Sequence, residues 1–351
     1  MILGTRPEII KLAPVVKELE KRGIDFFILH TGQHFSYNMD RVFFEQLELP
    51  QPKYNLGVGS GSHGEQTAKM LLGVERVLTD ERPDVVIVQG DTNSTLAGAL
   101  AAVKLQVPVA HVEAGLRSFD MSMPEEVNRV VVDHVSTLLF APTQLSRRNL
   151  EREGIVEGVY VTGNTIVDAI MMYSPRIEEA KLPLDLPMEY VLLTLHRQEN
   201  VDNPVRLASA IKGVGLVAEE LKVHVIFPVH PRTRLRLVEY GIRVPDGLVL
   251  LEPLGYFQFL KLLKGSRVVL TDSGGVQEEA CILGVPCVTL RYNTERPETV
   301  YVGANVVAGL DPQRILSKTL EMADKRGSWP NPLGDGRAAE KIVRTLKDDL
   351  G

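Results

Sequence analysis

The sequence predicts an α/β protein of two domains, each built on a doubly wound parallel sheet. The chain has 351 residues, which is too long for one ordinary core and suits two domains of about 150 to 200 residues each. Hydrophobic residues make up 44% and charged residues 24%, as in ordinary globular proteins. Short apolar, β-branched runs alternate with helical patterns along the chain, which is typical of parallel sheets with helical crossovers.

The apolar runs form two sets of six. The first set comprises residues 1–3, 26–30, 84–89, 108–114, 137–142 and 158–163. The second set comprises residues 190–195, 224–229, 248–253, 267–272, 286–291 and 304–309. Each set supplies the strands of one Rossmann-like domain, with helices in the stretches between the runs.

The domain boundary is expected after the first set of runs. A helical stretch from about residue 165 to residue 180 precedes residues 181–187, whose prolines and lack of periodicity indicate a linker. The predicted organisation is therefore an N-terminal domain, a helix and linker, a C-terminal domain and a last helix, at residues 1–165, 166–187, 188–335 and 336–351.

Charge and cysteine content narrow the classes of partner. The formal charge of −6 argues against a general nucleic-acid binder or a binder of anionic membranes. The two cysteines, Cys281 and Cys287, fall in a helical and an apolar strand pattern, which favours buried thiols over a disulfide or zinc site. No apolar run is long enough to span a membrane and the first residues do not resemble a signal peptide, so a cytoplasmic protein is expected.

Polar and charged residues follow several predicted strands, where ligands bind in open parallel α/β sheets. Asp91 and Glu113 occupy two such ends in the first domain, where acid–base work and helix capping or ion pairing are about equally expected. His196 and His230 occupy corresponding positions in the second domain. A single histidine after a strand is usually structural, but Arg197 adjoins His196 and favours anion binding.

Two helix starts carry further candidates. Ser273-Gly274-Gly275 precedes a helical pattern, and its N–H groups suit either a diphosphate or a plain helix cap. Glu279 lies little more than one turn along that helix, where it is either a ribose ligand or a solvated residue. Glu125 and Arg129 share one face of another predicted helix, a spacing that by itself favours a surface ion pair.

The order of motifs resembles the non-hydrolysing UDP-N-acetylglucosamine 2-epimerases, a family with the two-domain GT-B fold. The matching elements are Gly4-Thr5-Arg6-Pro7-Glu8-Ile9-Ile10-Lys11, Thr31-Gly32-Gln33-His34, Gly90-Asp91-Thr92, His111-Val112-Glu113-Ala114-Gly115-Leu116-Arg117, Pro124-Glu125-Glu126-Val127-Asn128-Arg129, His196-Arg197, Thr271-Asp272-Ser273-Gly274-Gly275 with Glu278-Glu279, and Thr294-Glu295-Arg296-Pro297-Glu298. The resemblance implies two Rossmann-like domains facing across a cleft, with the acid–base residues in the first and UDP in the second.

The resemblance also assigns residues to the two ends of the substrate. It implies that UDP is held by Arg6, His196, Ser273, Gly274, Gly275 and Arg296, with Glu279 on the ribose, the turn from Leu254 to Phe259 beside the uracil, and His230 nearby. It implies that Lys11, Asp91, Glu113, Glu125 and Arg129 surround the sugar and, with His196, form the catalytic set.

The implied reaction inverts carbon 2 of UDP-N-acetylglucosamine (UDP-GlcNAc) to give UDP-N-acetylmannosamine (UDP-ManNAc). UDP departs, a carboxylate removes the C2 proton to give 2-acetamidoglucal, and UDP is added again after reprotonation from the other face. Cations and a helix N-terminus stabilise the departing diphosphate, so no cofactor and no metal are expected. The family likeness further implies a homodimer. A hydrolysing epimerase and a GT-B glycosyltransferase remain alternatives, and a non-catalytic nucleotide-sugar sensor is disfavoured by the carboxylates.

Overall fold

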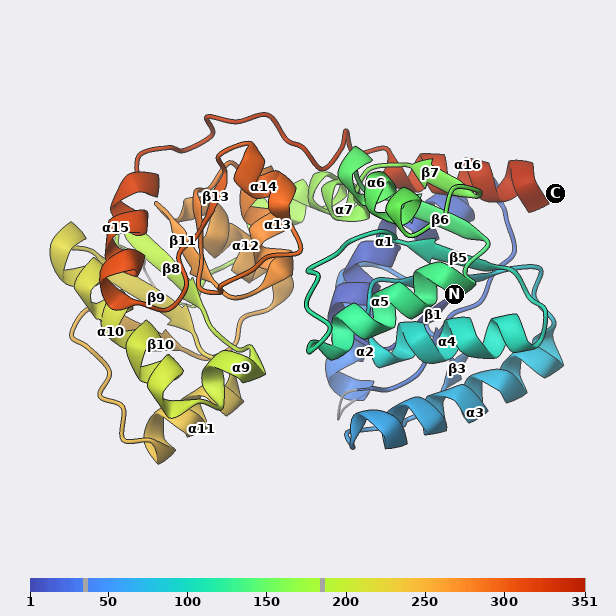
Figure 1. Ribbon diagram of the computed structural model, residues 1–351, viewed down its shortest axis with the longest axis horizontal. Helices are drawn as coiled ribbons and strands as arrows, with labels where there is room; N and C mark the ends of the chain where they lie inside the picture. The colour runs from blue at the N-terminus through green and yellow to red at the C-terminus, as the bar shows by residue number, and fades with distance from the viewer. Residues whose placement is uncertain (34–36, 184–186, 351) are drawn as a thin grey trace. The chain divides into compact units, whose positions relative to one another are not determined.

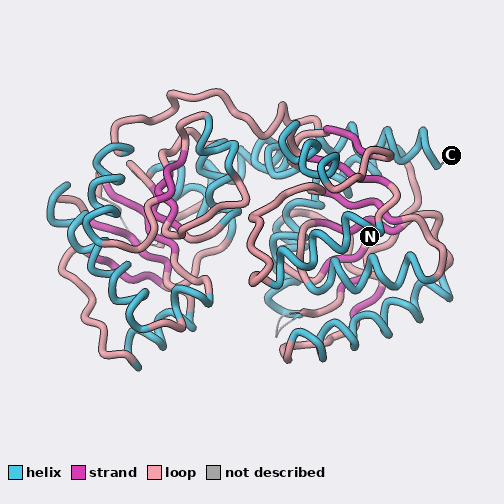
Figure 2. The backbone as a smooth tube through the Cα atoms, in the orientation of Figure 1, coloured by secondary structure: helices cyan, strands magenta, loops and turns pink. Residues whose placement is uncertain are grey.

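The computed structural model describes residues 1–33, 37–183 and 187–350 (Figure 1). The chain divides into two compact units, one made of Met1–Met172 with Leu333–Gly351 and the other of Tyr173–Pro332. The second unit begins ahead of the proline-containing segment 181–187, and residues 184–186 of that predicted linker lie outside the described residues. Parallel strands flanked by helices form both units (Figure 2), which confirms the predicted fold class.

The first unit contains seven described strands and most of the N-terminal helices. Its strands are β1 (Ile2–Leu3), β2 (Leu29–His30), β3 (Tyr54–Asn55), β4 (Val86–Gln89), β5 (Val109–Val112), β6 (Leu138–Ala141) and β7 (Val159–Val161). Its helices are α1 (Arg6–Arg22), α2 (Tyr37–Gln46), α3 (His63–Glu81), α4 (Asn93–Lys104), α5 (Pro124–Val135), α6 (Gln144–Arg152), α7 (Thr165–Met172) and α16 (Ala338–Leu350).

The second unit repeats this alternation. Its strands are β8 (Tyr190–Thr194), β9 (His224–Pro228), β10 (Leu248–Leu251), β11 (Val269–Thr271), β12 (Cys287–Thr289) and β13 (Asn305–Val307). Its helices are α8 (Ser174–Glu179), α9 (Gln198–Val201), α10 (Pro204–Leu221), α11 (Pro231–Glu239), α12 (Tyr256–Gly265), α13 (Gly274–Ile282), α14 (Pro297–Tyr301) and α15 (Pro312–Met322).

The strand order is the same in both units. In the second unit it is β10-β9-β8-β11-β12-β13. In the first unit the strands pair as β1-β2-β3 and as β4-β5-β6-β7, and β1 also lies against β4. Numbered from its own first strand, each unit therefore begins with the doubly wound order 3-2-1-4-5-6. Neighbouring strands pair in parallel, as β4 does with β5 and β8 does with β9.

Buried aliphatic side chains hold helices to both faces of each sheet. In the second unit, Leu193, Val225 and Leu270 share a core with Val214 of α10 and Ile315 of α15, and α10 packs beside α15. In the first unit, α4 packs between α3 and α5, while α1, α7 and α16 contact one another. Burial of these apolar faces is the main stabilising term, at about 25 cal/mol per Å².

The structure departs from the predicted elements in two places. All of the predicted apolar runs contain a strand, but β3 was not predicted because Tyr54 and Asn55 form only a two-residue strand without an apolar run. The predicted helical stretch 165–180 is two helices, because Pro175 has no N–H to bond the carbonyl of Met171 and its ring clashes with that carbonyl. Cys281 and Cys287 are buried free thiols, as predicted.

Asp168 in α7 fastens α16 to the first unit. Its carboxylate oxygens accept hydrogen bonds from the N–H groups of Ala338 at 3.2 Å and Ala339 at 2.9 Å, at the start of α16. Burial raises the pKa of Asp168 above its ordinary value of 3.8 despite these two bonds. The folded chain therefore holds a proton on Asp168 at pH values where the unfolded chain has lost it.

We expect Asp168→Asn to destabilise the first unit by about 1 kcal/mol, the usual cost of one hydrogen bond. Because the folded pKa is raised, the stability that Asp168 contributes is complete below pH 3.8 and is lost as the pH rises through the folded pKa. The cost of the substitution should therefore be larger at pH 4 than at pH 7. Urea unfolding of both proteins at the two pH values measures this, and a cost that grows with pH would contradict it.

Candidate active site

Each sheet has one point where the strand order reverses, and doubly wound proteins bind ligands beside the strand carboxyl ends at that point. In the first unit the reversal lies between β1 and β4, which are followed by residues 4–6 and 90–91. In the second unit it lies between β8 and β11, which are followed by residues 195–197 and 272–275. Most of the predicted site residues therefore lie at, or next to, the switch point of their own unit.

Glu113 follows β5 and is buried beside a cation. Lys11, on the buried face of α1, forms an ion pair with Glu113 Oε2, and both side chains are almost fully buried. Gln89, the last residue of β4, donates from Nε2 to the same carboxylate oxygen at 3.1 Å. These two contacts fix the orientation of the Glu113 carboxylate, as a proton-transfer group requires.

The backbone of Glu113 adopts a left-handed conformation, with φ of +73°. A residue with a Cβ pays about 1–3 kcal/mol for this conformation, and such strain persists only where the surroundings fix it. Gly115 also has positive φ, and a Cβ there would lie 2.3 Å from the Ser146 carbonyl oxygen. The turn after β5 is thus built to aim one carboxylate at the strand ends at the cost of backbone strain.

Asp91 is the second carboxylate at this edge of the sheet. It is half-buried after β4 and forms an ion pair with Arg129 of α5. Arg129 also forms an ion pair with Glu126, and Asn128 of the same helix donates to the Asp91 carbonyl oxygen at 2.9 Å. Glu125, one residue before Glu126, is half-buried in the first turn of α5. Helix α5 therefore presents its first two turns to the Asp91 segment.

Glu8 joins the two segments at the switch point of the first unit. Its Oε2 accepts from Gly4 N at 2.8 Å and from the Thr5 hydroxyl at 2.9 Å. Its Oε1 contacts the hydroxyls of Thr92 at 2.7 Å and Thr95 at 3.0 Å. Burial raises the pKa of Glu8, and the four hydrogen bonds oppose that rise. Glu8 thereby fixes the turn that precedes Arg6 against the start of α4.

Arg6 opens α1 at the same turn. Its guanidinium lies over the ring of Phe43, 5.1 Å from the ring centre. When the face of a guanidinium group lies on an aromatic ring, its N–H donors point outward in the guanidinium plane and can reach an anion.

In the second unit, Asp272 organises the turn after β8. This carboxylate is fully buried and accepts from His196 N at 3.1 Å and Arg197 N at 2.9 Å. It also accepts from Asn200 Nδ2 at 3.2 Å and lies 3.3 Å from Nδ1 of His196. The rest of the His196 ring stays accessible, since 44% of its side chain is exposed. The ring can therefore meet a ligand with its Nε2 edge.

The start of α13 provides backbone donors for an anion. Ser273 caps the helix by accepting from Val276 N at 3.5 Å, and Gly274 and Gly275 form its first turn. N–H groups in a first turn lack acceptors within the helix and, with the helix dipole, favour negative charge. A Cβ on Gly274 would lie 2.4 Å from Oε1 of buried Glu295, so a side chain at that position would force a rearrangement. Ser273 thus forms the predicted cap, and the packing of Glu295 accounts for the glycine at position 274.

Several charged side chains of the second unit lie close to this helix start. Arg296 is buried and forms an ion pair with Glu278 of α13. Glu279, the next residue of α13, is almost fully buried, so it is not the solvated helix residue that was one of its two predicted alternatives. Arg197 Nη2 lies 3.4 Å from Oε1 of Glu295, which Arg291 also binds. These pairs place cations beside the first turn of α13.

The turn from Leu254 to Phe259, which was predicted to lie beside the uracil, leads into α12. Leu254 and Phe259 are both half-buried on either side of Tyr256, which opens the helix. The pKa of the buried Tyr256 hydroxyl is raised well above its ordinary value by desolvation and by the charge of Glu279. The influence of Glu279 indicates that this turn lies near α13. His230, after β9, accepts from Arg232 N through Nδ1 at 3.2 Å and so caps α11.

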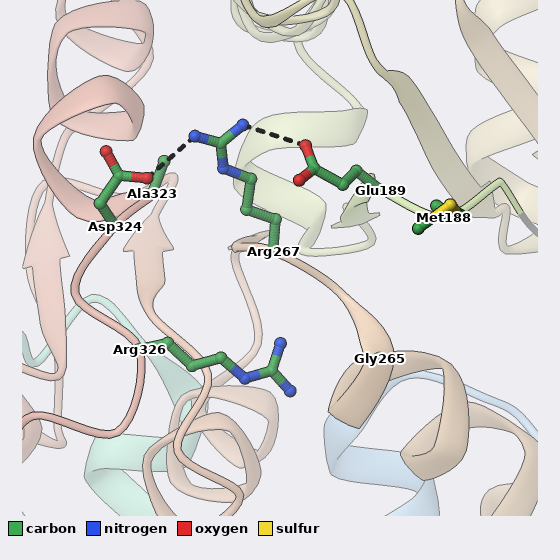
Figure 3. A pocket seen from close by; sticks show the side chains of 7 residues that line it. All are labelled: Met188, Glu189, Gly265, Arg267, Ala323, Asp324 and Arg326. Carbon is green, nitrogen blue, oxygen red and sulfur yellow. Dashed lines mark hydrogen bonds and ion pairs between the residues drawn. The ribbon is translucent and has the colours of Figure 1, made fainter.

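A separate pocket opens at the other edge of the second sheet, near the amino ends of β8 and β11. Figure 3 shows Arg267 between Glu189 and Asp324. Its Nη1 lies 3.3 Å from Glu189 Oε2, and its Nη2 lies 2.9 Å from Asp324 Oδ1. Arg326 donates to backbone carbonyls, so both arginines of the pocket already have partners. The lining residues are Met188, Glu189, Gly265, Arg267, Ala323, Asp324 and Arg326. Paired cations away from the strand carboxyl ends do not favour this pocket as the nucleotide site.

The described residues contain neither a candidate metal centre nor a candidate membrane span. Across residues 1–33, 37–183 and 187–350, three or more His, Cys, Asp or Glu side chains are nowhere arranged to hold a metal ion. Over the same described part of the chain, no helix combines the length and apolar character needed to cross a membrane.

Three buried carboxylates position the predicted residues, a role that was not predicted for them from the sequence. Asp133, Glu126 and Asp272 are buried carboxylates that bind backbone N–H groups or cations of the predicted turns. Asp133 had a weak signal, because it lies eight residues after Glu125 and hence near the same face of α5. His34, which is part of one motif of the resemblance, lies outside the described residues.

Two doubly wound units with charged side chains at their switch points define an enzyme of the GT-B class. A family model described as UDP-N-acetylglucosamine 2-epimerase matches residues 17–347. UDP-N-acetylglucosamine 2-epimerase of Methanocaldococcus jannaschii is 54% identical, with 99% of this chain and 98% of that protein covered. UDP-2,3-diacetamido-2,3-dideoxy-D-glucuronate 2-epimerase of Pseudomonas aeruginosa is 42% identical, with 98% of each covered.

A solved structure gives the same result. The Methanocaldococcus jannaschii UDP-GlcNAc 2-epimerase in complex with UDP-GlcNAc and UDP is 53% identical and has a TM-score of 0.93, over 99% of this chain and 98% of that one. The chain belongs to the UDP-N-acetylglucosamine 2-epimerase family. The predicted family and the predicted class of enzyme, an isomerase, are confirmed.

Proposed function

We propose that the chain interconverts UDP-GlcNAc and UDP-ManNAc without net hydrolysis. The observation that carries the proposal is the pair of carboxylates after β4 and β5, each held by its own cation. Glu113 is ion-paired with Lys11, and Asp91 with Arg129. Inversion of carbon 2 by elimination and re-addition needs a proton-transfer group on each face of the sugar, and two separately held carboxylates meet that need.

The first half of the reaction breaks two bonds of the sugar. The bond from C1 to the diphosphate oxygen breaks, and UDP leaves with its electron pair. Positive charge at C1 acidifies the C2 hydrogen, a carboxylate takes it as a proton, and the electrons of the C–H bond form the C1=C2 double bond of 2-acetamidoglucal. In the second half a proton returns to the other face of C2 and UDP adds again to C1. No atom is gained or lost, and no oxidant is consumed.

The side chains of the first unit suit the sugar end of this reaction. Lys11 and Arg129 place a positive charge beside each of the two candidate carboxylates. Glu125, half-buried in the first turn of α5, is a further carboxylate at this edge.

The side chains of the second unit suit the UDP end. We assign the diphosphate to His196, Arg296 and the N–H groups of the Ser273–Gly275 turn, because these combine donors, positive charge and a helix dipole. Arg197 is assigned to the same anion. Glu279 on α13 is assigned to the ribose hydroxyls, and the Leu254–Phe259 turn to the uracil, with His230 as an outer contact.

Solvent exchange tests the proposed route directly. When UDP-GlcNAc is turned over in D2O, we expect the UDP-ManNAc formed to carry deuterium at C2, because the proton removed by a carboxylate exchanges with solvent before another returns. Proton NMR and mass spectrometry of the product measure this, with a reaction in H2O and an enzyme-free sample in D2O as controls. Product that retains protium completely would rule out this proton transfer.

The same incubation separates the alternatives. Without any acceptor, an epimerase gives a mixture of the two UDP-sugars at equilibrium. A hydrolysing enzyme gives free N-acetylmannosamine and UDP, and a glycosyltransferase gives no change. Because a 42%-identical relative acts on UDP-2,3-diacetamido-2,3-dideoxy-D-glucuronate, that sugar is a second candidate substrate and should be assayed in parallel.

We also propose that the protein is a cytoplasmic homodimer. Two free, buried cysteines support a reducing compartment. Burial raises the pKa of Cys281 to about 12, which keeps this thiol protonated. The dimer is an expectation from the family resemblance, and sedimentation of the purified chain tests it.

A further inference from the structure

Asp133 is a buried carboxylate whose two oxygens bind on either side of Glu113. Its Oδ1 lies 2.7 Å from Nδ1 of His111, two residues before Glu113. Its Oδ2 accepts from the N–H of Gly115, two residues after Glu113, at 3.1 Å. The side chains of Asp133 and His111 have no exposed surface. One carboxylate therefore holds both ends of the strained turn described above.

His111 carries the same network to the other candidate carboxylate. Its Nε2 lies 2.8 Å from the carbonyl oxygen of Gly90, the residue that precedes Asp91. A carbonyl oxygen is only an acceptor, so Nε2 meets Gly90 as a donor while Nδ1 faces Asp133. The turns that bear Asp91 and Glu113 are thus connected through one imidazole ring.

Arg117 connects this network to the edge of the unit. It donates to Asp133 Oδ2 at 2.6 Å and holds Glu153 through two hydrogen bonds, at 2.7 and 2.6 Å. Burial by itself raises the pKa of Asp133, but the charges and hydrogen bonds of His111 and Arg117 outweigh it and hold the pKa below 3.8. Removing the charge of Asp133 would take one of two carboxylate partners from the buried Arg117 guanidinium, which is costly.

We infer that Asp133 is a positioning residue that acts through His111 and Gly115 to fix the relative placement of Asp91 and Glu113. The inference rests on the proposed function, because it assigns a purpose to the spacing of the two acid–base groups. A left-handed backbone at Glu113 is held only if its surroundings determine it, and Asp133 supplies a contact on each side. Arg129 and Asp133 are four residues apart on α5, so one helix supports both turns.

A purely structural role of Asp133 would have different consequences. If Asp133 only stabilised the fold, its loss would lower the free energy of unfolding while each folded molecule kept its turnover and its affinity for UDP. A positioning residue instead changes the rate of the chemical step in molecules that remain folded. The nucleotide contacts assigned to the second unit should be unaffected in either case.

The test compares Asp133→Asn with Asp168→Asn, a second buried aspartate of the first unit that accepts two N–H groups far from the turns in sequence. Turnover per folded molecule, UDP affinity by calorimetry and thermal unfolding are measured for each. We expect Asp133→Asn to lower turnover about 10- to 50-fold, as small misplacements of catalytic groups do, with UDP affinity as in wild type. Asp168→Asn should unfold more easily and keep its turnover.

His111→Gln provides a second variant. Its amide can still donate to the Gly90 carbonyl but loses the ring contact with Asp133, so we expect a smaller loss of turnover than in Asp133→Asn. If Asp133→Asn is unfolded at the assay temperature, His111→Gln decides. Wild-type turnover in the folded variants, or unfolding of both, overturns the positioning role. A wild-type protein that forms no epimer refutes the proposed function instead, so the two failures are distinguishable.

Discussion

Glu113→Gln and Asp91→Asn should each lower turnover about 10²- to 10⁴-fold, the usual contribution of a positioned acid or base. Each substitution removes the proton acceptor but keeps the size and shape of the side chain. Neither residue is among those assigned to UDP, so UDP affinity should stay close to that of the unmodified protein. Initial rates from both UDP-sugars and calorimetry with UDP measure the two quantities.

Asp168→Asn is the matched control for these variants, because it neutralises a buried carboxylate of the same unit without touching the turns. Its turnover should equal that of wild type. Deuterium exchange at C2 distinguishes the two faces of the sugar. A variant that has lost the base for one face should exchange the C2 hydrogen of one epimer more slowly than that of the other. Wild-type turnover in both Glu113→Gln and Asp91→Asn would make these carboxylates structural, as one reading of the sequence allowed.

His196→Ala should weaken UDP binding roughly 10- to 150-fold, which corresponds to the ~1.5–3 kcal/mol of a hydrogen bond to a charged group. Asp272 fixes the backbone of His196 and Arg197 and leaves the far edge of the ring accessible. An imidazole held in this way can meet the diphosphate and assist its departure. Calorimetric titration with UDP gives the affinity, and turnover at saturating substrate shows whether the leaving step is also slower.

His224→Ala is the control for this variant. That histidine begins β9, at the opposite end of the strands in the same unit, and is exposed. It should bind UDP as wild type does. Equal UDP affinity in His196→Ala and His224→Ala would refute the assignment of the diphosphate to the β8 turn, whatever the outcome for Glu113 and Asp91.

Most of the architecture could be predicted from the sequence because alternation of apolar runs and helical patterns is a long-range signal. The strands themselves are shorter than the runs, as the run 108–114 and β5 at Val109–Val112 illustrate. The surplus residues are part of the functional turn, where Glu113 leaves the extended conformation. Apolar side chains reveal burial, but they do not reveal where the backbone stops being a strand.

The candidate site was predictable only in part, and again for a physical reason. Residues just after strands were found because parallel topology gathers strand ends at one edge. Asp133 and Asp272 were not found, because an aspartate within a helix or beside a helix start is usually a solvated residue or a cap. Their importance comes from burial and from partners distant in sequence, such as His111 and His196. Sequence spacing carries little information about such contacts.

The return of the chain to the first unit has a consequence for the order of folding. Residues 173–332 form the second unit without interruption, whereas the first unit also requires α16, which packs on α1 and α7. During synthesis the second unit can therefore be complete while α1 and α7 still expose the surface that α16 covers. Domains usually fold in the order in which they leave the ribosome. Here the unit that starts first finishes last, so its nascent form has to remain soluble throughout translation of the inserted unit.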